Sequence, residues 1–261
     1  MNGLLKWTVL WLALYCVGCG SAARPANAYG NAADLMADMS VRSDKISSFR
    51  ITGRVDHFGK EHRIQGKVFL FARLPSKLRV DLLSPFGSTL SVLTVNDGRF
   101  AMSDIREDRY LEGPADPCNI ARLVRIPLPP EDVARVLVGH TPIIDGAAEV
   151  IWSDKGYYRV TISDGDRTQL LDVGPDPDVL PLLRSRLEDS AGQIYDMSFE
   201  RWRSVKGIPI PHEIRIKMPR DDADLLVRYD DDGVELNVKM PADAWDHSFP
   251  DGADVEHVTC D

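Results

Sequence analysis

The sequence predicts a mainly antiparallel β protein with a few helices, and three observations support this fold class. From Phe49 onward, apolar residues alternate with a period of two, which is typical of strands. About ten or eleven such segments follow one another, nearly all joined by turn-length connections, which favours a meandering antiparallel sheet. The alternation is interrupted once, between residues 117 and 142, by a segment with helical character.

The first expected element is a helix that begins after Asn31. Asparagine is a favoured N-cap residue, and Leu35, Met36 and Met39 follow it at helical spacing. The strands come after this helix, and we expect the helix to pack on them.

Two turn signals divide the strands further along the chain. The Asn-Asp-Gly stretch at 96–98 predicts a tight hairpin turn. The Asp-Gly pair at 232–233 predicts another hairpin turn rather than a calcium site, because the ligand spacing of a calcium loop is absent. The tail at 241–261 is expected to be irregular.

Several strands carry apolar residues on both faces, for example in stretches 67–72 and 224–229. A sheet with one face open to water would instead alternate apolar and polar residues. The second face is therefore either covered by helices or lines an apolar cavity, and a curved sheet around a helical lid satisfies both.

The mid-chain interruption predicts two short helices. In the second, Pro130 suits the first helical position and Gly139 suits the C-terminal stop. Val133, Val136 and Leu137 then share one face, because they are spaced at i, i+3 and i+4. We expect these three side chains to point toward the sheet.

The N-terminus has the pattern of a signal peptide. Lys6 precedes an uncharged run, Trp7–Gly18, that is shorter than the roughly 20 residues of a transmembrane helix. Val17, Gly18 and Cys19 resemble a bacterial lipobox, which implies cleavage before Cys19 and its lipid modification. The alternatives are an ordinary secretory signal, cleaved somewhere after Ala22, and a retained membrane helix.

The expected organisation follows from this signal. Residues 1–18 are the lipoprotein signal peptide, 19–30 are a lipidated flexible tether, and 31–261 form one domain. Gly20, in the position after the modified cysteine, is compatible with transport to the outer membrane. The net charge of −9 argues against nucleic acid as a partner.

Two cysteines remain after Cys19. Cys118 and Cys260 in an exported chain predict one disulfide, with two free thiols as the alternative.

No set of residues predicts a reaction, so we expect no enzyme, no cofactor and no metal site. The six histidines form no tight ligand pair. His57 and His62 flank a probable turn and are expected to face solvent, whereas His212 is expected to be structural.

The stretch Ser84, Pro85, Phe86 and Gly87 joins two predicted strands. Serine, proline and glycine occupy the first, second and fourth positions that a type I β-turn favours. Phe86 is then at the tip, where it either projects into solvent or folds back onto the core.

Two stretches, "LRVDLLSPFGSTLSVLTVNDGRF" and, about 20 residues later, "IARLVRIPLPPEDVARVLVGHTP", resemble the LolA/LolB superfamily in order and spacing. The later "GIPIPHEIRIK" and the lipobox are also similar to LolB-like members. The resemblance implies an incomplete, half-open antiparallel β-barrel of about eleven strands, with a helical lid over an apolar cavity. Val133, Val136 and Leu137 would belong to that lid.

The resemblance also implies a function. The protein would be an outer-membrane lipoprotein, facing the periplasm, that accepts acylated lipoproteins from a LolA-like periplasmic carrier and inserts them into the membrane. The loop Ser84–Gly87 would assist insertion through Phe86, and the protein would act as a monomer. The alternatives are a protein of this fold that binds another lipid or hydrophobic ligand, and an assembly lipoprotein that binds partner proteins.

Overall fold

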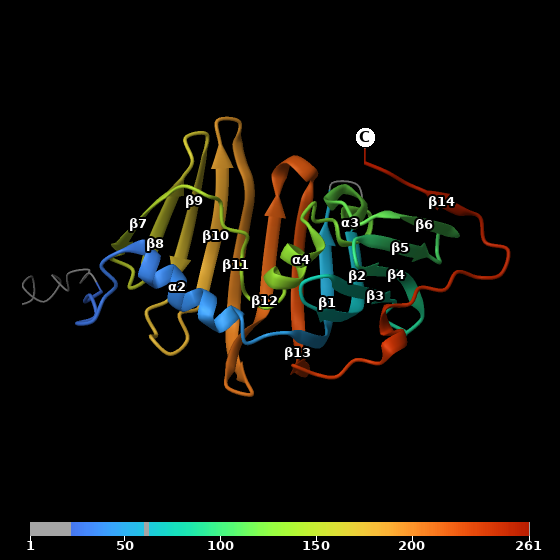
Figure 1. The fold of residues 1–261 in the computed structure, drawn as a ribbon, viewed down its shortest axis with the longest axis horizontal. Coiled ribbons are helices and arrows are strands. Elements are labelled where there is room, and N and C mark those ends of the chain that lie inside the picture. The colour runs from blue at the N-terminus through green and yellow to red at the C-terminus, as the bar shows by residue number, and fades with distance from the viewer. Residues whose placement is uncertain (1–21, 60–62, 261) are drawn as a thin grey trace, which may run out of the picture.

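A computed structural model describes residues 22–59 and 63–260 (Figure 1). The predicted signal peptide, Cys19 and His62 lie outside the described residues. No helix in the described part of the chain is long and apolar enough to cross a membrane.

The described strands form one sheet of fourteen, in the order β14-β6-β5-β4-β3-β2-β1-β13-β12-β11-β10-β9-β8-β7. Neighbouring strands are antiparallel except β14 and β6, which are parallel. The strands are β1 (Ser48–Phe58), β2 (Arg63–Arg73), β3 (Lys77–Leu83), β4 (Thr89–Asn96), β5 (Arg99–Asp104), β6 (Arg109–Pro114), β7 (Ala147–Trp152), β8 (Tyr158–Ser163), β9 (Arg167–Val173), β10 (Leu182–Asp189), β11 (Gly192–Val205), β12 (Ile208–Met218), β13 (Ala223–Leu236) and β14 (Val255–His257).

The sheet is open, since β14 and β7 are its two edges and do not pair with each other. It is strongly twisted: β8 to β13 run almost vertically in Figure 1, whereas β3 to β6 run across the view. The expectation of ten or eleven strands was too low. One reason is that β14 has three residues, too few to show a period-two pattern, and lies in the tail expected to be irregular.

In the described part of the chain, three α-helices lie over one face of this sheet (Figure 1). They are α2 (Ala32–Ser43), α3 (Pro117–Val124) and α4 (Pro130–Val136). Asn31 caps α2 as predicted, because its side chain accepts a hydrogen bond from the backbone N–H of Asp34 at 2.8 Å. Leu35 of α2 and Ile120 of α3 are fully buried, so the helices and the inner face of the sheet share one apolar core.

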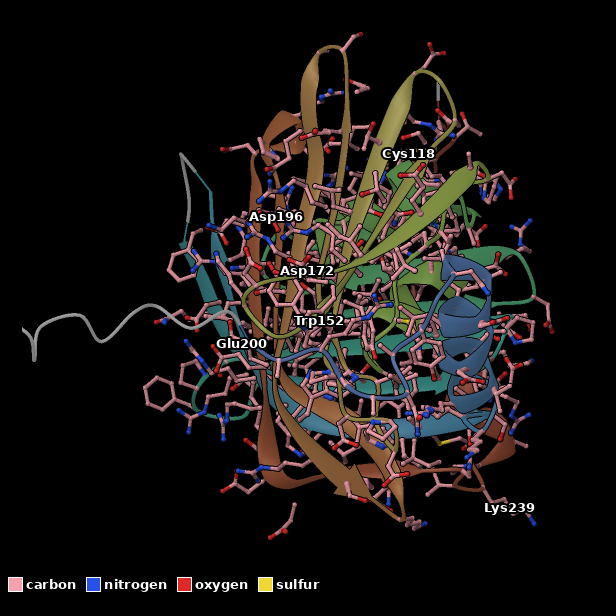
Figure 2. The ribbon with its side chains drawn as sticks, turned by 90° about the vertical axis from the view of Figure 1, so that its left-hand side faces the viewer. Cys118, Trp152, Asp172, Asp196, Glu200 and Lys239 are labelled. Atoms are coloured by element: carbon pink, nitrogen blue, oxygen red, sulfur yellow. A yellow bond between two sulfur atoms is a disulfide. The ribbon has the colours of Figure 1, made fainter. Side chains whose placement is uncertain are left out.

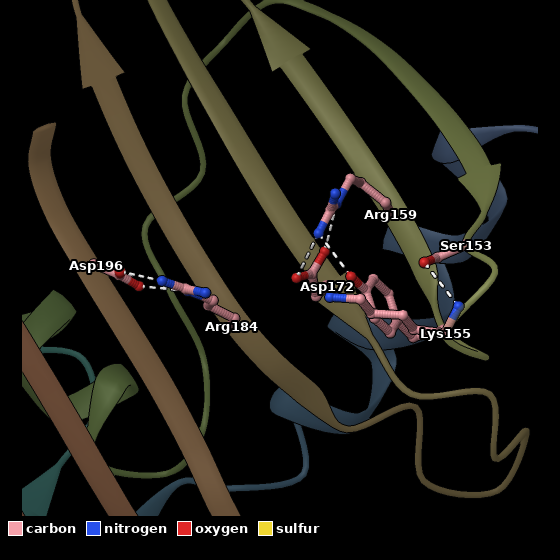
Figure 3. Close-up of polar contacts among 7 residues, drawn as sticks. Ser153, Lys155, Arg159, Asp172, Arg184 and Asp196 are labelled. Atoms are coloured by element: carbon pink, nitrogen blue, oxygen red, sulfur yellow. Dashed lines mark hydrogen bonds and ion pairs between the residues drawn. The ribbon is translucent and has the colours of Figure 1, made fainter. Parts of the chain in front are cut away.

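Ion pairs cover much of the opposite, outer face. Figure 3 shows Arg159 on β8 paired with Asp172 on β9, at 2.7 Å, and Arg184 on β10 paired with Asp196 on β11. Arg215 and Asp224 continue the series on β12 and β13. Each exposed pair contributes little to stability, but together the pairs keep this face polar. An apolar ligand therefore has to enter on the helical side.

The tail covers the outer face of β3 to β5. Trp245, in the short helix η2 (Ala242–Trp245), is buried there. His247 lies within hydrogen-bond distance of the hydroxyls of Thr94 (3.1 Å) and Ser103 (2.9 Å). Burial lowers the pKa of His247 to about 4, so the ring is neutral at pH 7. The tail thus forms a second layer on the outer face of this part of the sheet.

The predicted hairpin turn at 232–233 is absent, because β13 continues through it. The pairing of β13 with β1 passes from Tyr229 opposite Gly53 to Val234 opposite Ile51, so the intervening residues bulge out. A Cβ atom on Gly233 would lie 2.6 Å from the backbone oxygen of Thr52. The glycine allows a close approach of two backbones rather than a turn.

Candidate functional site

The main candidate site is an apolar pocket between the helices and the inner face of the sheet. Its walls come from α3, α4, β1 to β4, β12 and β13, and its volume is about 90 Å³. The apolar side chains that define it include Val68, Leu70, Val80, Val133, Val136 and Leu137.

The α4 residues predicted to face inward do so. Val133 and Val136 are 1% exposed and Leu137 is 5% exposed, and all three line the pocket. The backbone oxygen of Leu137 accepts a hydrogen bond from the buried hydroxyl of Tyr229 at 2.5 Å. This bond ties the C-terminal end of α4 to the sheet.

The pocket is smaller than the cavity that the resemblance implies. A dry cavity of about 150 Å³ accommodates benzene, so 90 Å³ does not hold a long acyl chain. Two further spaces lie beside it on the concave face. One, of about 360 Å³, lies beyond Pro127 and Leu128 of the α3–α4 loop, and the other, of about 380 Å³, lies between α2 and the segment that follows α4.

The mouth of the pocket is polar. It is lined by Asp104 at the end of β5, by Arg106 of the β5–β6 turn, and by Arg122 and Arg125 at the C-terminal end of α3. His57 of β1 lies there too, which corrects the expectation that it faces solvent. Its Nδ1 is buried and has no hydrogen-bond partner among the described residues. Burial and the nearby Arg125 lower the pKa of His57.

The loop around Phe86 is ordered by three hydrogen bonds that all involve Ser84. Its carbonyl accepts the N–H of Gly87 at 2.9 Å, which closes the predicted turn. Its backbone N–H donates to Ser88, and its hydroxyl accepts from the Ser88 N–H. Phe86 itself is 96% exposed and so does not fold back onto the core.

Phe86 and the pocket mouth lie at the same end of the strands. Because neighbouring strands are antiparallel, β1, β3 and β5 all end on this side of the sheet, and the turns β1–β2, β3–β4 and β5–β6 follow there. Phe58, Phe86 and Ile105 are exposed large apolar side chains at these three turns. His57 and Asp104, which line the mouth, belong to the same strand ends. An apolar rim therefore stands beside the opening of the pocket.

The structure joins Cys118 and Cys260 in a disulfide across a sequence separation of 142. Cys118 is in the first turn of α3, and the next residue, Asn119, is buried and donates a hydrogen bond to the carbonyl of Pro114 at 3.0 Å. The N-terminal end of α3 is thus fixed to β6 and to the tail. The C-terminal end, which carries Arg122 and Arg125, has no such covalent link.

The described part of the predicted tether, residues 22–30, contacts the β7–β8 end of the molecule, which faces the viewer in Figure 2. The N–H of Ala22 donates to the carbonyl of Asp154, and the indole N–H of Trp152 donates to the carbonyl of Ala22. The ring of Tyr29 packs edge-on against Tyr158. The β7–β8 turn lies at the opposite ends of the strands from the turn that carries Phe86.

Within 22–59 and 63–260, no group of three or more His, Cys, Asp or Glu side chains could hold a metal ion. His212 is buried, and its Nδ1 lies 3.3 Å from the carbonyl of Ile210.

The fold and the site define a class of protein in which an open, curved antiparallel sheet and a few helices enclose apolar pockets. No known family model matches the chain. Over 95 residues it is 32% identical to the outer-membrane lipoprotein LolB of Hamiltonella defensa. That stretch is 36% of this chain and 44% of that protein, so the match spans less than half the length of the curated relative.

Three solved structures share the fold. A DUF1329 family protein from Desulfovibrio piger has a TM-score of 0.57 at 14% identity and covers 82% of this chain and 95% of its own. A LolA superfamily protein from Nitrosomonas europaea has a TM-score of 0.51 at 12% identity, and the match covers 83% of this chain and 98% of that protein. A putative outer membrane lipoprotein-sorting protein domain from Vibrio parahaemolyticus has a TM-score of 0.51 at 8% identity, and the match covers 82% of this chain and 95% of that domain. The chain therefore shares the fold of these three proteins, and over 95 residues its sequence is similar to that of a LolB protein.

Proposed function

We propose that this protein is an outer-membrane lipoprotein receptor that binds the acyl chains of other lipoproteins beneath α3 and α4 and passes them to the membrane. The observation that carries the proposal is that the mouth of the apolar pocket and the exposed Phe86 lie at the same end of the strands. The similarity to a protein named outer-membrane lipoprotein LolB supports the choice of cargo.

Binding of an acyl chain requires the pocket to widen. The α3–α4 loop, which contains Pro127 and Leu128, separates the pocket from the neighbouring space of about 360 Å³. A displacement of this loop would join the two spaces into one larger channel, apolar in the pocket and partly polar in the second space. Because the disulfide fixes the N-terminal end of α3, we infer that the opening movement occurs at the C-terminal end of α3 and in α4.

The transfer needs no chemical reaction, cofactor or metal. Each methylene group moved from water to an apolar site contributes about 0.8 kcal/mol. An acyl chain therefore moves toward whichever site excludes water better, first from a LolA-like carrier to this pocket and then to the bilayer. Moving Phe86 into hydrocarbon contributes about 1.5–3 kcal/mol, which is enough to favour docking beside the bilayer but not to anchor the protein.

The anchor would be the acylated Cys19, with residues 19–30 as the tether. Two residues lie between Cys19 and Ala22, so the three steps along the chain span about 10 Å at most. While Ala22 is bound to Asp154 and Trp152, the anchor is held near the ends of the strands opposite to Phe86. For Phe86 to contact the bilayer in which Cys19 is anchored, we infer that residues 22–30 detach from the domain. The chain from Cys19 to Asn31, 12 steps long, can then extend to about 40 Å.

The test is recovery of the natural cargo. Protein purified without detergent from its native envelope should carry acylated lipoproteins, identified by mass spectrometry after denaturation. A Val136→Asp variant should carry much less, whereas Arg54→Gln, on the outer face of β1, should carry the same amount as the unmodified chain. Recovery of protein partners that lack acyl chains, in both variants alike, would instead favour an assembly lipoprotein.

A further inference from the structure

We propose that the mouth of the pocket is a binding site for an anionic oxygen group, a carboxylate or a phosphate, at the end of an acyl-chain ligand. The groups that form it are the hydroxyl of Ser91, the imidazole of His57, and the guanidinium groups of Arg122 and Arg125. This inference rests on the proposed acyl-chain pocket and specifies a class of ligand for it.

Ser91 gives the strongest indication. The residue is 0% exposed, lines the pocket, and its hydroxyl has no hydrogen-bond partner among the described residues. An unpaired buried hydroxyl costs free energy, since it loses its bonds to water. Its strand neighbours, Val92 and Leu90, point to the other face, so the side chain of Ser91 faces the inner space that a ligand would occupy. A ligand oxygen would satisfy it.

His57 is a second unpaired group in the same pocket. Its Nδ1 is buried without a partner in the described part of the chain, on β1, across β2 and β3 from Ser91 on β4. Two unsatisfied polar atoms therefore line the same pocket. A ligand that was a hydrocarbon chain throughout would leave both unsatisfied.

The charges at the mouth favour an anion. Arg125 is exposed at the C-cap of α3, in the left-handed region with φ of 61°, where its backbone N–H donates to the carbonyl of Ala121 at 3.0 Å. Its guanidinium group forms no hydrogen bond or ion pair with the described residues. Among the described residues, the guanidinium group of Arg122 donates to the amide oxygen of Asn119 alone, at 3.0 Å.

The acidic groups nearby are already engaged. Asp104 accepts hydrogen bonds from the backbone of its own turn and lies 3.8 Å from Arg106. On the side of His57, Asp224 is paired with Arg215 at 2.7 Å, and Asp222 also contributes negative charge. Because these acids are occupied or lie beyond the mouth, two arginines remain available to a ligand. Arginine binds carboxylate and phosphate through paired N–H groups.

The experiment uses three probes that share a twelve-carbon chain: dodecanoate, dodecyl phosphate and dodecanol. Each is titrated into the full mature chain below its critical micelle concentration, with binding measured by calorimetry. The two anionic probes should bind about tenfold or more tightly than dodecanol, because a hydrogen bond to a charged group is worth more than one to a neutral group. The ratio between the two anions distinguishes a fatty-acid carboxylate from a phosphate headgroup.

Three variants assign the effect to the mouth. Arg122→Gln, Arg125→Gln and Ser91→Ala should each weaken binding of the anionic probes about tenfold and leave dodecanol binding unchanged. Ser91→Ala should also fold normally and keep or raise the melting temperature, because it removes an unpaired hydroxyl. Arg54→Gln is the matched control, since Arg54 is an exposed arginine on the same strand as His57 but on the opposite face.

The outcomes separate this inference from the proposed function. Equal binding of all three probes, unaffected by the arginine variants, would overturn the anion site and leave the acyl-chain pocket standing. Failure of all three probes to bind would overturn both. Anion binding that is lost equally in Arg54→Gln would show a non-specific charge effect and would also overturn the site.

Discussion

Replacement of Phe86 by glutamate tests the apolar rim. The side chain is 96% exposed and the hydrogen bonds of its turn come from Ser84, Gly87 and Ser88. The folded state therefore loses almost nothing. A surface substitution of this kind changes the free energy of unfolding by about 0.5 kcal/mol or less, which corresponds to about 1–2 °C in melting temperature for a domain of this size.

The same substitution should have a large effect at a membrane. Insertion of one phenylalanine contributes about 1.5–3 kcal/mol, a factor of about 10–150 in a partition coefficient, and a glutamate adds the cost of dehydrating a charge. The turn loses little entropy on insertion, because Pro85 fixes its own φ and the turn is already hydrogen-bonded.

The assay is flotation of the chain from residue 20 onward, which lacks the lipidated cysteine, with vesicles of neutral phospholipid. Phe86→Glu should reduce the bound fraction at least about tenfold in partition coefficient. Phe86→Leu should retain most of it, and Ile151→Glu, which alters another exposed apolar residue at the β7 edge, should have no effect. Equal flotation of Phe86→Glu and the unmodified chain, with both fully folded, would refute the membrane role of this loop.

Three other predictions follow from the structure. Val136→Asp places an unpaired carboxylate at a position that is 1% exposed, so it should lower the free energy of unfolding by about 3 kcal/mol or more. A decrease of less than about 1 kcal/mol, measured by denaturant titration, would contradict the packing of α4. Reduction of Cys118–Cys260 should destabilise the chain by about 2–5 kcal/mol and expose the tail to proteases first, and unchanged proteolysis of residues 241–260 would show that the disulfide does not hold the tail. His247 has a pKa of about 4 when folded, below its ordinary value, so the unfolded chain binds more protons between about pH 6.5 and 4 and stability should fall as the pH falls through that window. His247→Gln should flatten that part of the stability profile, and an unaltered slope would contradict the burial of the ring.

Local patterns in the sequence were sufficient for much of the fold. The capping of α2 by Asn31, the turn at 96–98 and the inward face of α4 each depend on residues close together in the chain, and the structure contains all three. The β14 strand and the packing of His247 depend on contacts across more than 140 residues, which a single sequence does not reveal. The turn expected at 232–233 is instead a bulge, because the contact of Gly233 with Thr52 comes from a distant strand.

The candidate site was predicted in part. The positions of Val133, Val136 and Leu137 followed from helical spacing, and the exposed tip at Phe86 followed from the turn residues. The polar mouth was missed, since His57, Ser91 and Arg125 come from three elements with no common motif. An available signal was the serine at position 91, a polar residue in step with the apolar inward positions 93 and 95 of its strand.

Site-specific photocrosslinking is the most direct test of whether acyl chains bind beneath α4. A photoreactive amino acid in place of Val136, and the same residue in place of Arg54 on the outer face of β1, would be exposed to a triacylated lipoprotein delivered by a LolA-like carrier. If acyl chains bind there, mass spectrometry should find an adduct at position 136 that contains the acyl chains, and none at position 54. Adducts at position 54 alone, or adducts at position 136 that contain only polypeptide, would contradict it.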